Sequence, residues 1–281
     1  MTSARLVTRF APSPTGYLHR GHAVSALTAH QAAKDAGGRF ILRIEDIDAT
    51  RCRSAFETAI LEDLAWLGLD WEQPVRRQSE HLSDYRAALE TLEQRGLLYR
   101  CFKTRREVLD DIGRAPHGPQ PAYRGDPLPP PEEARRVTAG EPFAWRLSIA
   151  AAERALGGFD ALTFTEPGAG VFAADPEAAG DIVLARKDVG VAYHLAVVVD
   201  DALQGVTHVI RGQDLFEATH IQRLLQALLQ LPTPLYSHHR LLLGPDGKRL
   251  AKRDHAETLR DLRARGVTPE ALRAELGFAG R

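Results

Sequence analysis

The sequence predicts an α/β fold in which a parallel β-sheet is interrupted by an insertion. An apolar strand over Arg5–Ala11 runs into a Pro/Gly turn, a small-residue helix follows over Gly21–Ala36, and a second strand follows over Arg39–Ile44. This alternation is typical of parallel strands joined by helical crossovers. It is lost within Thr104–Gly180 and resumes afterwards. The pattern predicts a Rossmann-type nucleotide-binding domain that carries an inserted α+β subdomain.

The remaining elements and the domain boundaries follow from the same periodicities. The further elements expected are helices Cys52–Leu67 and Ser79–Arg95, strand Ile182–Arg186, helix Tyr193–Leu203, strand Thr207–Ile210, and helices Leu215–Leu229 and Pro269–Leu276. Seven prolines within Pro116–Pro131 indicate a loop or a subdomain border. We expect the two halves of the Rossmann domain at 1–103 and 181–240, the inserted subdomain at 104–180, and a basic loop with a short helical tail at 241–281.

The composition is that of an ordinary soluble globular protein. Hydrophobic residues make up 44% of the 281 residues and charged residues 26%. No run approaches the roughly 20 apolar residues that span a bilayer, and Met1–Phe10 is too polar for a secretion signal. Cys52 and Cys101 cannot form a disulfide framework, so a reducing compartment, the cytoplasm, is expected.

Positive charge is local rather than general. The net charge is −1, which argues against indiscriminate binding of nucleic acid. Five Lys or Arg residues and no acid lie within 95–106, and nine Lys or Arg residues stand against five acids within 248–281. Both stretches are suited to RNA phosphates, and the alternative is a solvated surface.

The segment Arg9–His22, RFAPSPTGYLHRGH, predicts a nucleotide site. A strand ends, Pro and Gly form a tight turn, and a helix begins, whose N-terminal N–H groups and dipole hold phosphate well. Gly21 is expected to leave space for a base or ribose. His19 and His22 are three residues apart and face the same turn, where each can donate to a phosphate. The alternative is a structural turn with two surface histidines.

Five sequence blocks, in the same order, resemble those of class I glutamyl-tRNA synthetases. Arg9–His22 resembles the family's first signature, which ends in a variant of His-Ile-Gly-His. RFILRIEDID (Arg39–Asp48), Asp188–Asp201 with Tyr193, and VIRGQD (Val209–Asp214) match later blocks, and RLAKR (Arg249–Arg253) resembles the Lys-Met-Ser-Lys-Ser loop. The resemblance implies the catalytic domain of a class I aminoacyl-tRNA synthetase with an acceptor-type insertion. It implies a ligase that activates L-glutamate with ATP.

Glutamate carries one cation and two carboxylates, so a pocket for it needs an acid and arginines. Glu45 can hold the ammonium group, and Arg9 and Arg211 can hold carboxylates. The alternative for Glu45 and Arg211 is a surface salt bridge each. Asp46 and Asp48 are interpreted as loop residues rather than metal ligands. The resemblance implies a glutamate pocket made of Arg9, Phe10, Ala11, Pro12, Ser13, Glu45, Tyr193 and Arg211.

The basic turn Pro245–Arg253 is expected to stabilise negative charge during adenylation. That chemistry needs positioning and cations more than a side-chain nucleophile. We expect Lys252 to contact the phosphates, with Lys248 and Arg253 as weaker candidates, and the alternative is a solvated basic loop. The resemblance implies catalytic roles for His19, His22 and Lys252, ATP binding by these three and Gly21, and Mg²⁺ that enters with the nucleotide.

Two positions of this loop depart from the family's usual pattern. Arg249 stands where Lys is common, and Ala251 stands where Ser or Thr is common. We expect the lost hydroxyl to weaken contacts to ATP or pyrophosphate, and Lys252 to keep the main charge.

Only 28 residues follow Arg253, whereas a complete glutamyl-tRNA synthetase continues into a long anticodon-binding region. The chain therefore resembles the family's shorter paralogues, which activate glutamate without tRNA and transfer it to the queuosine base in the anticodon of tRNA(Asp). We expect a monomer that uses this tRNA and no membrane. Two alternatives stay open: a free-standing enzyme that charges tRNA(Glu) at its 3′ end, and a catalytically silent RNA-binding paralogue.

These paralogues often hold zinc in the insertion through Cys-x-Cys and Tyr-x3-Cys. Here the corresponding segments are Cys101-Phe-Lys103 and Tyr123-Arg-Gly-Asp-Pro127. Tetrahedral zinc needs four N, S or O ligands, and Cys101 with Tyr123 does not suffice. His117 and Asp126 could substitute in principle, but at an unsupported spacing. We therefore expect no structural zinc and interpret Cys101 as a small buried residue.

Overall fold

The structure is a computed structural model that describes residues 5–104, 106–109, 122–186, 190–242 and 257–279. Its elements are, in chain order, β1 (Val7–Phe10), α1 (Arg20–Asp35), β2 (Arg39–Ile44), α2 (Ser54–Trp66), β3 (Glu72–Arg77), α3 (Leu82–Gln94), β4 (Leu98–Cys101), α5 (Pro130–Thr138), β5 (Ala144–Leu147), α6 (Ile149–Leu156), β6 (Thr163–Glu166), β7 (Gly170–Ala173), β8 (Val183–Arg186), β9 (Gly190–Val191), α7 (Tyr193–Leu203), β10 (His208–Gly212), α8 (Phe216–Leu228), β11 (Leu235–His239), α9 (Leu259–Ala264) and α10 (Pro269–Glu275). No helix in these ranges is long and apolar enough to cross a membrane.

The parallel strands form the predicted Rossmann-type arrangement. Strands β1, β2 and β3 pair in parallel in that order, and β10 pairs in parallel with β11. The Thr207 N–H, just before β10, donates to the Val7 carbonyl at 3.0 Å, so β10 adjoins β1. The chain therefore runs outward from β1 through β2 to β3, and outward again from β10 to β11. The direction reverses between β1 and β10, which is where such folds bind their ligands.

The strand at 182–186 forms, but its predicted place in the parallel sheet is wrong. As β8 it pairs antiparallel with β5, in a four-stranded sheet of order β4-β5-β8-β9. Strand β4, which was not predicted and whose residues were expected in the first Rossmann half, lies in the same sheet. Periodicity indicates that a strand exists but carries no information on its partner. By strand pairing, the inserted subdomain would extend from about β4 to β9, and the exact domain boundaries stay a proposal.

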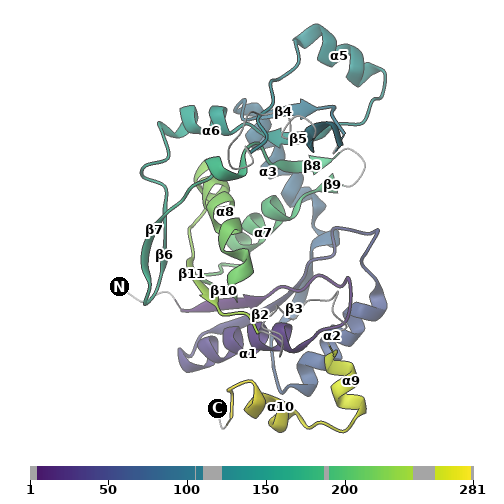
Figure 1. Cartoon of the computed structure of the whole chain (residues 1–281), viewed down its shortest axis with the longest axis vertical. Coiled ribbons are helices and arrows are strands. Elements are labelled where there is room, and N and C mark those ends of the chain that lie inside the picture. The colour runs from purple at the N-terminus through teal and green to yellow at the C-terminus, as the bar shows by residue number, and fades with distance from the viewer. Residues whose placement is uncertain (1–4, 105, 110–121, 187–189, 243–256, 280–281) are drawn as a thin grey trace.

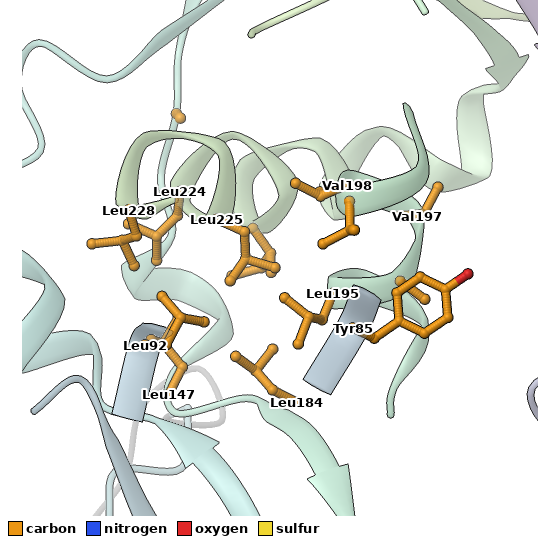
Figure 2. Close-up of a cluster of buried hydrophobic side chains, with 14 of the residues drawn as sticks. Tyr85, Leu92, Leu147, Leu184, Leu195, Val197, Val198, Leu224, Leu225 and Leu228 are labelled. Atoms are coloured by element: carbon orange, nitrogen blue, oxygen red, sulfur yellow. The ribbon is translucent and has the colours of Figure 1, made fainter. Parts of the chain in front are cut away.

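The parallel strands and the inserted sheet share a hydrophobic core, part of which Figure 2 shows. Leu147 of β5 and Leu184 of β8 are fully buried against leucines of α7 and α8. Helix α3 adds Leu92 and Tyr85 from the same cluster. Helices α7 and α8 therefore lie between the two sheets, as Figure 1 shows, and tie the insertion to the strands that carry the site.

A second core joins the C-terminal helices to α1 and α2. The side chains of Leu259, Leu262 and Leu272 are at most 1% exposed within this cluster. Thr258 begins α9 with a capping box to Asp261. The Leu259 N–H donates to the Leu18 carbonyl at 2.8 Å, which fixes α9 beside the start of α1. The predicted helix at 269–276 is present as α10.

Several elements were not predicted because their local patterns are weak. Strand β3, EQPVRR, is polar and has one apolar residue besides its proline. Strands β6 and β7, which form a hairpin, are each only four residues long, and β11 is five residues long. Sequence periodicity cannot distinguish such short segments from loops.

Candidate active site

A cavity of about 380 Å³ lies where the parallel strands end. The C-terminal residues of β1 and β10, the residues after β2 and β11, the first turn of α1 and the start of α7 line it. Eleven of the twelve site residues named from the sequence lie on its wall: Arg9, Phe10, Ala11, Pro12, Ser13, His19, Gly21, His22, Glu45, Tyr193 and Arg211. The twelfth, Lys252, is outside the described residues, as are Lys248, Arg249, Ala251 and Arg253. Their roles stay predictions.

The first turn of α1 presents two paired histidines to the cavity. His19 is the N-cap residue, and its Nδ1 accepts from the Gly21 N–H at 3.1 Å. The His19 N–H donates in turn to Nδ1 of His22, also at 3.1 Å. Since both Nδ1 atoms are acceptors, a neutral ring carries its proton on Nε2 in each case. The two imidazoles can therefore act as donors to an anionic oxygen.

The structure gives a local reason for glycine at position 21, on the wall of the cavity. A Cβ atom at this position would come within 3.0 Å of the His19 ring. Glycine therefore lets the His19 ring fold back over the helix start, where its Nδ1 caps the helix. That Gly21 also leaves space for a base or ribose stays a prediction.

Two charged residues that the sequence did not single out hold Arg9 and Glu45 in place. Arg43 is wholly buried in β2 and donates to Asp201 Oδ1 at 2.8 Å and to Glu45 Oε1 at 3.1 Å. Arg9 Nε lies 3.2 Å from the same Asp201 oxygen. The available signals were an arginine within the apolar run FILRI and a pair of acids after VVV. Neither signal says which residues meet.

Burial and ion pairing oppose each other across this network. Burial raises the pKa of Glu45, against the attraction of Arg43 and Arg9. Burial would also raise the pKa of Asp201, but Arg9 and Arg43 outweigh it and lower that pKa. Burial alone would lower the pKa of Arg43, yet Asp201, Glu45 and Asp200 raise it. The ionised form of Glu45 therefore depends on the arginine beside it.

Arg211 is a buried cation, and the atoms that accept its hydrogen bonds carry no charge. Its guanidinium donates to Thr219 Oγ1 at 2.6 Å, to Gln222 Oε1 at 2.7 Å and to His238 Nε2 at 3.1 Å. Burial lowers the pKa of Arg211. Within the described part of the chain, no carboxylate lies within 4.0 Å of it. A buried cation on a cavity wall favours an anion in that cavity.

Further polar residues of the cavity were missed by the sequence interpretation. Ser25, Asp214, His239 and Arg240 also line it. Ser25 Oγ lies 2.8 Å from His239 Nε2, which joins α1 to the end of β11. Asp214 belongs to a recognised block, but its place beside the cavity follows from the turn after β10.

Asp46 and Asp48 occupy the loop after β2. Asp46 accepts hydrogen bonds from Ser79, and Asp48 accepts from Thr50 and Arg51. The side-chain bond from Thr50, followed by that from Arg51, lowers the pKa of Asp48 to about 2. Both carboxylates therefore lie in the loop, as predicted, and stabilise it; that they bind no metal stays a prediction.

The insertion does not present a zinc-binding set among its described residues. Within the described ranges, no three His, Cys, Asp or Glu side chains are arranged so that they could hold a metal ion. Cys101 is buried, as interpreted, with its Sγ 3.8 Å from the Tyr123 hydroxyl. The Lys103 ammonium lies 6.0 Å from the Tyr123 ring centre, and a cation does not suit a zinc site. The expected lack of zinc stays a prediction, and His117 lies outside the described residues.

The family model and two relatives of similar length are all tRNA synthetases. Residues 5–280 match the family described as tRNA synthetases class I (E and Q), catalytic domain. A glutamyl-Q tRNA(Asp) synthetase of Rhodobacter capsulatus is 48% identical over 97% of this chain and 100% of its own length. One from Symbiobacterium thermophilum is 44% identical over 97% of this chain and 86% of its own length.

Full-length glutamate-charging enzymes match over part of their length. The glutamate–tRNA ligase of Aquifex aeolicus is 38% identical over 96% of this chain, which spans 56% of that relative. A crystal structure of a glutamate tRNA ligase from Elizabethkingia meningosepticum, in complex with its amino acid, superposes with a TM-score of 0.82 at 28% identity. It covers 97% of this chain, and the chain covers 60% of it. The chain belongs to the class I tRNA synthetases of the E and Q group and has the fold of their catalytic domain.

Proposed function

We propose that this protein activates L-glutamate with ATP to glutamyl-adenylate without tRNA, and then transfers glutamate to the queuosine base in the anticodon of tRNA(Asp). We propose further that it does so as a cytoplasmic monomer. The observation that carries the first step is the charge pattern of one cavity. A buried acid, Glu45, and two buried arginines, Arg9 and Arg211, line the space beside a helix N-terminus.

The charge pattern fits glutamate better than glutamine. The Glu45 carboxylate suits an ammonium group, and each arginine suits a carboxylate. Arg9 already has Asp201 as a counter-ion, whereas Arg211 has only neutral contact atoms. We place the side-chain carboxylate of glutamate at Arg211, to which it gives an anionic partner, and the uncharged amide of glutamine could not do so. Tyr193 and Ser13 add hydroxyls to the same wall.

The adenylation step follows from how these groups hold the reactants. A carboxylate oxygen of glutamate attacks the α-phosphorus of ATP, the bond to the bridging oxygen breaks, and pyrophosphate leaves. The first turn of α1 and the Nε2 donors of His19 and His22 suit the phosphates. Mg²⁺ would accompany the triphosphate. Lys252 is the proposed cation for the transition state. Residues on both sides of its segment, Leu242 and Thr258, lie on the cavity wall and against His19.

The acceptor is proposed from the relatives. Three relatives named glutamyl-Q tRNA(Asp) synthetase are 44–48% identical to this chain, whereas five relatives named glutamate–tRNA ligase are 38–41% identical. In the transfer, an acceptor hydroxyl attacks the adenylate carbonyl and AMP leaves. Charging of tRNA(Glu) at its 3′ end remains the competing hypothesis. A silent RNA-binding paralogue is disfavoured because the buried charges of the cavity would be costly to keep without a ligand.

Pyrophosphate exchange tests the activation step. Purified protein should exchange labelled pyrophosphate into ATP when glutamate and Mg²⁺ are present, with no tRNA added. Glu45→Gln should raise the KM for glutamate strongly, whereas Glu62→Gln, at an exposed helical site, should leave it unchanged. Exchange that appears only with tRNA, or that prefers glutamine, would contradict the proposal.

Labelled glutamate tests the acceptor. Transfer should require tRNA(Asp) from cells that make queuosine, and tRNA(Asp) from cells that lack it should stay unlabelled. Removal of the 3′-terminal adenosine should leave transfer intact, because the proposed ester is in the anticodon. Labelling of tRNA(Glu) that disappears with this adenosine would establish the competing hypothesis instead.

A further inference from the structure

A buried chain of hydrogen bonds links Arg211 to the β6–β7 hairpin of the insertion. Arg211 of β10 donates from Nε to Nε2 of His238, at the end of β11. Nδ1 of the same imidazole contacts a carboxylate oxygen of Glu166, the last residue of β6. The His238 side chain is 2% exposed and that of Glu166 is 12% exposed, so these hydrogen bonds are largely shielded from water.

The hydrogen-bond chemistry defines one tautomer of His238. A guanidinium N–H can only donate, so Nε2 must carry a lone pair, and a neutral ring then carries its proton on Nδ1. The Glu166 carboxylate accepts that proton's hydrogen bond. The Thr219 hydroxyl, which accepts from Arg211 at 2.6 Å, lies 3.2 Å from the same Nε2 and can donate to it. Arg211 and Glu166 therefore require the Nδ1–H form of a neutral ring, and the Thr219 hydroxyl is compatible with it.

The hairpin is firmly placed to supply this carboxylate. Phe164 of β6 packs edge-on against Phe216 of α8 and Tyr236 of β11, with ring centres 5.7 and 5.6 Å away. Arg223 of α8 donates to the Thr163 carbonyl at 2.8 Å. Figure 1 shows β6 and β7 running beside β11 and α8, and β6 contacts β11 directly. Glu166 is therefore held by tertiary packing, 45 residues before Arg211 in the chain.

We propose that Glu166 and His238 are positioning residues that orient the Arg211 guanidinium for a carboxylate of the amino-acid substrate. Glu166 holds His238 as the neutral Nδ1–H tautomer, and His238 then takes the Arg211 Nε–H. The three observed contacts use three of the five guanidinium N–H donors, which leaves two for a substrate. The arrangement gives Arg211 a fixed direction without a carboxylate in direct contact. This inference rests on the proposed glutamate pocket.

Protonation of His238 would break the arrangement. Nε2–H would then point at the Arg211 Nε–H, so two cations and two donors would oppose each other. The charged or titratable groups that face this imidazole in the described structure are Arg211 from β10, Glu166 from β6, and His239 and Tyr236 from β11 itself. Burial lowers the pKa of His238, together with Arg211 and His239, and Glu166 opposes them. Replacing Glu166 by a neutral residue therefore lowers this pKa further.

Histidine nitrogen NMR tests the tautomer without relying on activity. In ¹⁵N-histidine-labelled protein, one imidazole should show the Nδ1–H pattern at pH 8 and should disappear in His238→Gln. Glu166→Gln should keep this tautomer, because its amide oxygen still accepts, but should move the titration of the ring to lower pH. Glu166→Leu should lose the single tautomer. An Nε2–H pattern for His238 in the unmodified protein would overturn the proposal.

Glutamate kinetics test the consequence for binding. At pH 8, Glu166→Leu should raise the KM for glutamate in pyrophosphate exchange about ten-fold, as expected for loss of one oriented charged hydrogen bond, with a smaller change in kcat. Glu166→Gln should stay within about two-fold of the unmodified protein. Glu177→Leu is the matched control, since Glu177 lies in the same insertion, is about half exposed and pairs with Arg124.

The outcomes separate the two proposals. Absence of glutamate-dependent exchange in the unmodified protein would refute the proposed function, whatever the histidine spectra show. Normal exchange, with the same KM in Glu166→Leu and Glu177→Leu, would refute the positioning role alone. If Glu166→Leu fails to fold, Glu166→Gln decides through its titration, because an unchanged pKa of His238 would also refute it.

Discussion

Replacing Arg43 by methionine should damage both stability and glutamate binding. Arg43 is wholly buried in β2 and lies within ion-pair distance of Asp201, Glu45 and Asp200, at 2.8, 3.1 and 3.5 Å. Methionine fills much of the volume but removes the charge. Asp201 would keep Arg9, and Asp200 would keep Arg76, Gln78 and Tyr85. Glu45 would lose its only direct cationic contact among the described residues.

The size of the effect follows from this loss. Breaking a buried ion pair by removing one partner costs about 3–5 kcal/mol. Such a change is a large fraction of a typical unfolding free energy of roughly 5–15 kcal/mol. Burial already raises the pKa of Glu45, and this pKa would rise further once Arg43 no longer favours the carboxylate. A higher pKa leaves more of Glu45 protonated at a given pH, so glutamate binding should weaken as pH falls and recover as pH rises through the new pKa.

Urea denaturation and pyrophosphate exchange across pH measure the two effects. Arg39→Met is the matched control, on the same strand, because Arg39 pairs with Glu72 at 2.6 Å while both side chains are substantially exposed. Such a surface pair contributes at most about 1 kcal/mol. Equal urea midpoints for the two variants, or a KM for glutamate that does not fall with rising pH in Arg43→Met, would refute the reasoning.

Three further outcomes are expected. Asp181→Ala should lower the unfolding free energy by about 3–5 kcal/mol in urea titrations, because it strips a buried acceptor from Tyr99, Gly125 and Ile149, and a loss below about 1 kcal/mol would contradict this. Lys252→Ala should slow exchange by orders of magnitude with an unchanged melting temperature; near-normal exchange would exclude the proposed charge stabilisation. Metal analysis of purified protein should find no stoichiometric zinc, and about one zinc per chain would overturn the prediction.

Long, periodic elements were predictable because their patterns are local. The helices at 54–66, 82–94, 193–203 and 216–228 lie within two or three residues of their predicted ends. The strand at 183–186 was found as well, but its sheet was not. Choice of a partner strand depends on which surfaces Leu147 and Leu184 bury together, and no local pattern encodes that.

The sequence alone named eleven residues of the cavity wall, because its blocks resemble a known family and because acids, arginines and histidines at strand ends suit a charged ligand. It could not name the residues that hold this wall in place. Arg43 and Asp201 are 158 residues apart, and Glu166 and His238 are 72 residues apart, yet each pair is in direct contact. Such contacts arise only when the strands and the hairpin pack, since burial makes a paired charge stable and an unpaired one costly. Tertiary structure therefore decided which side chains contact and hold the cavity residues, and the sequence indicated most of the charged side chains that line the cavity.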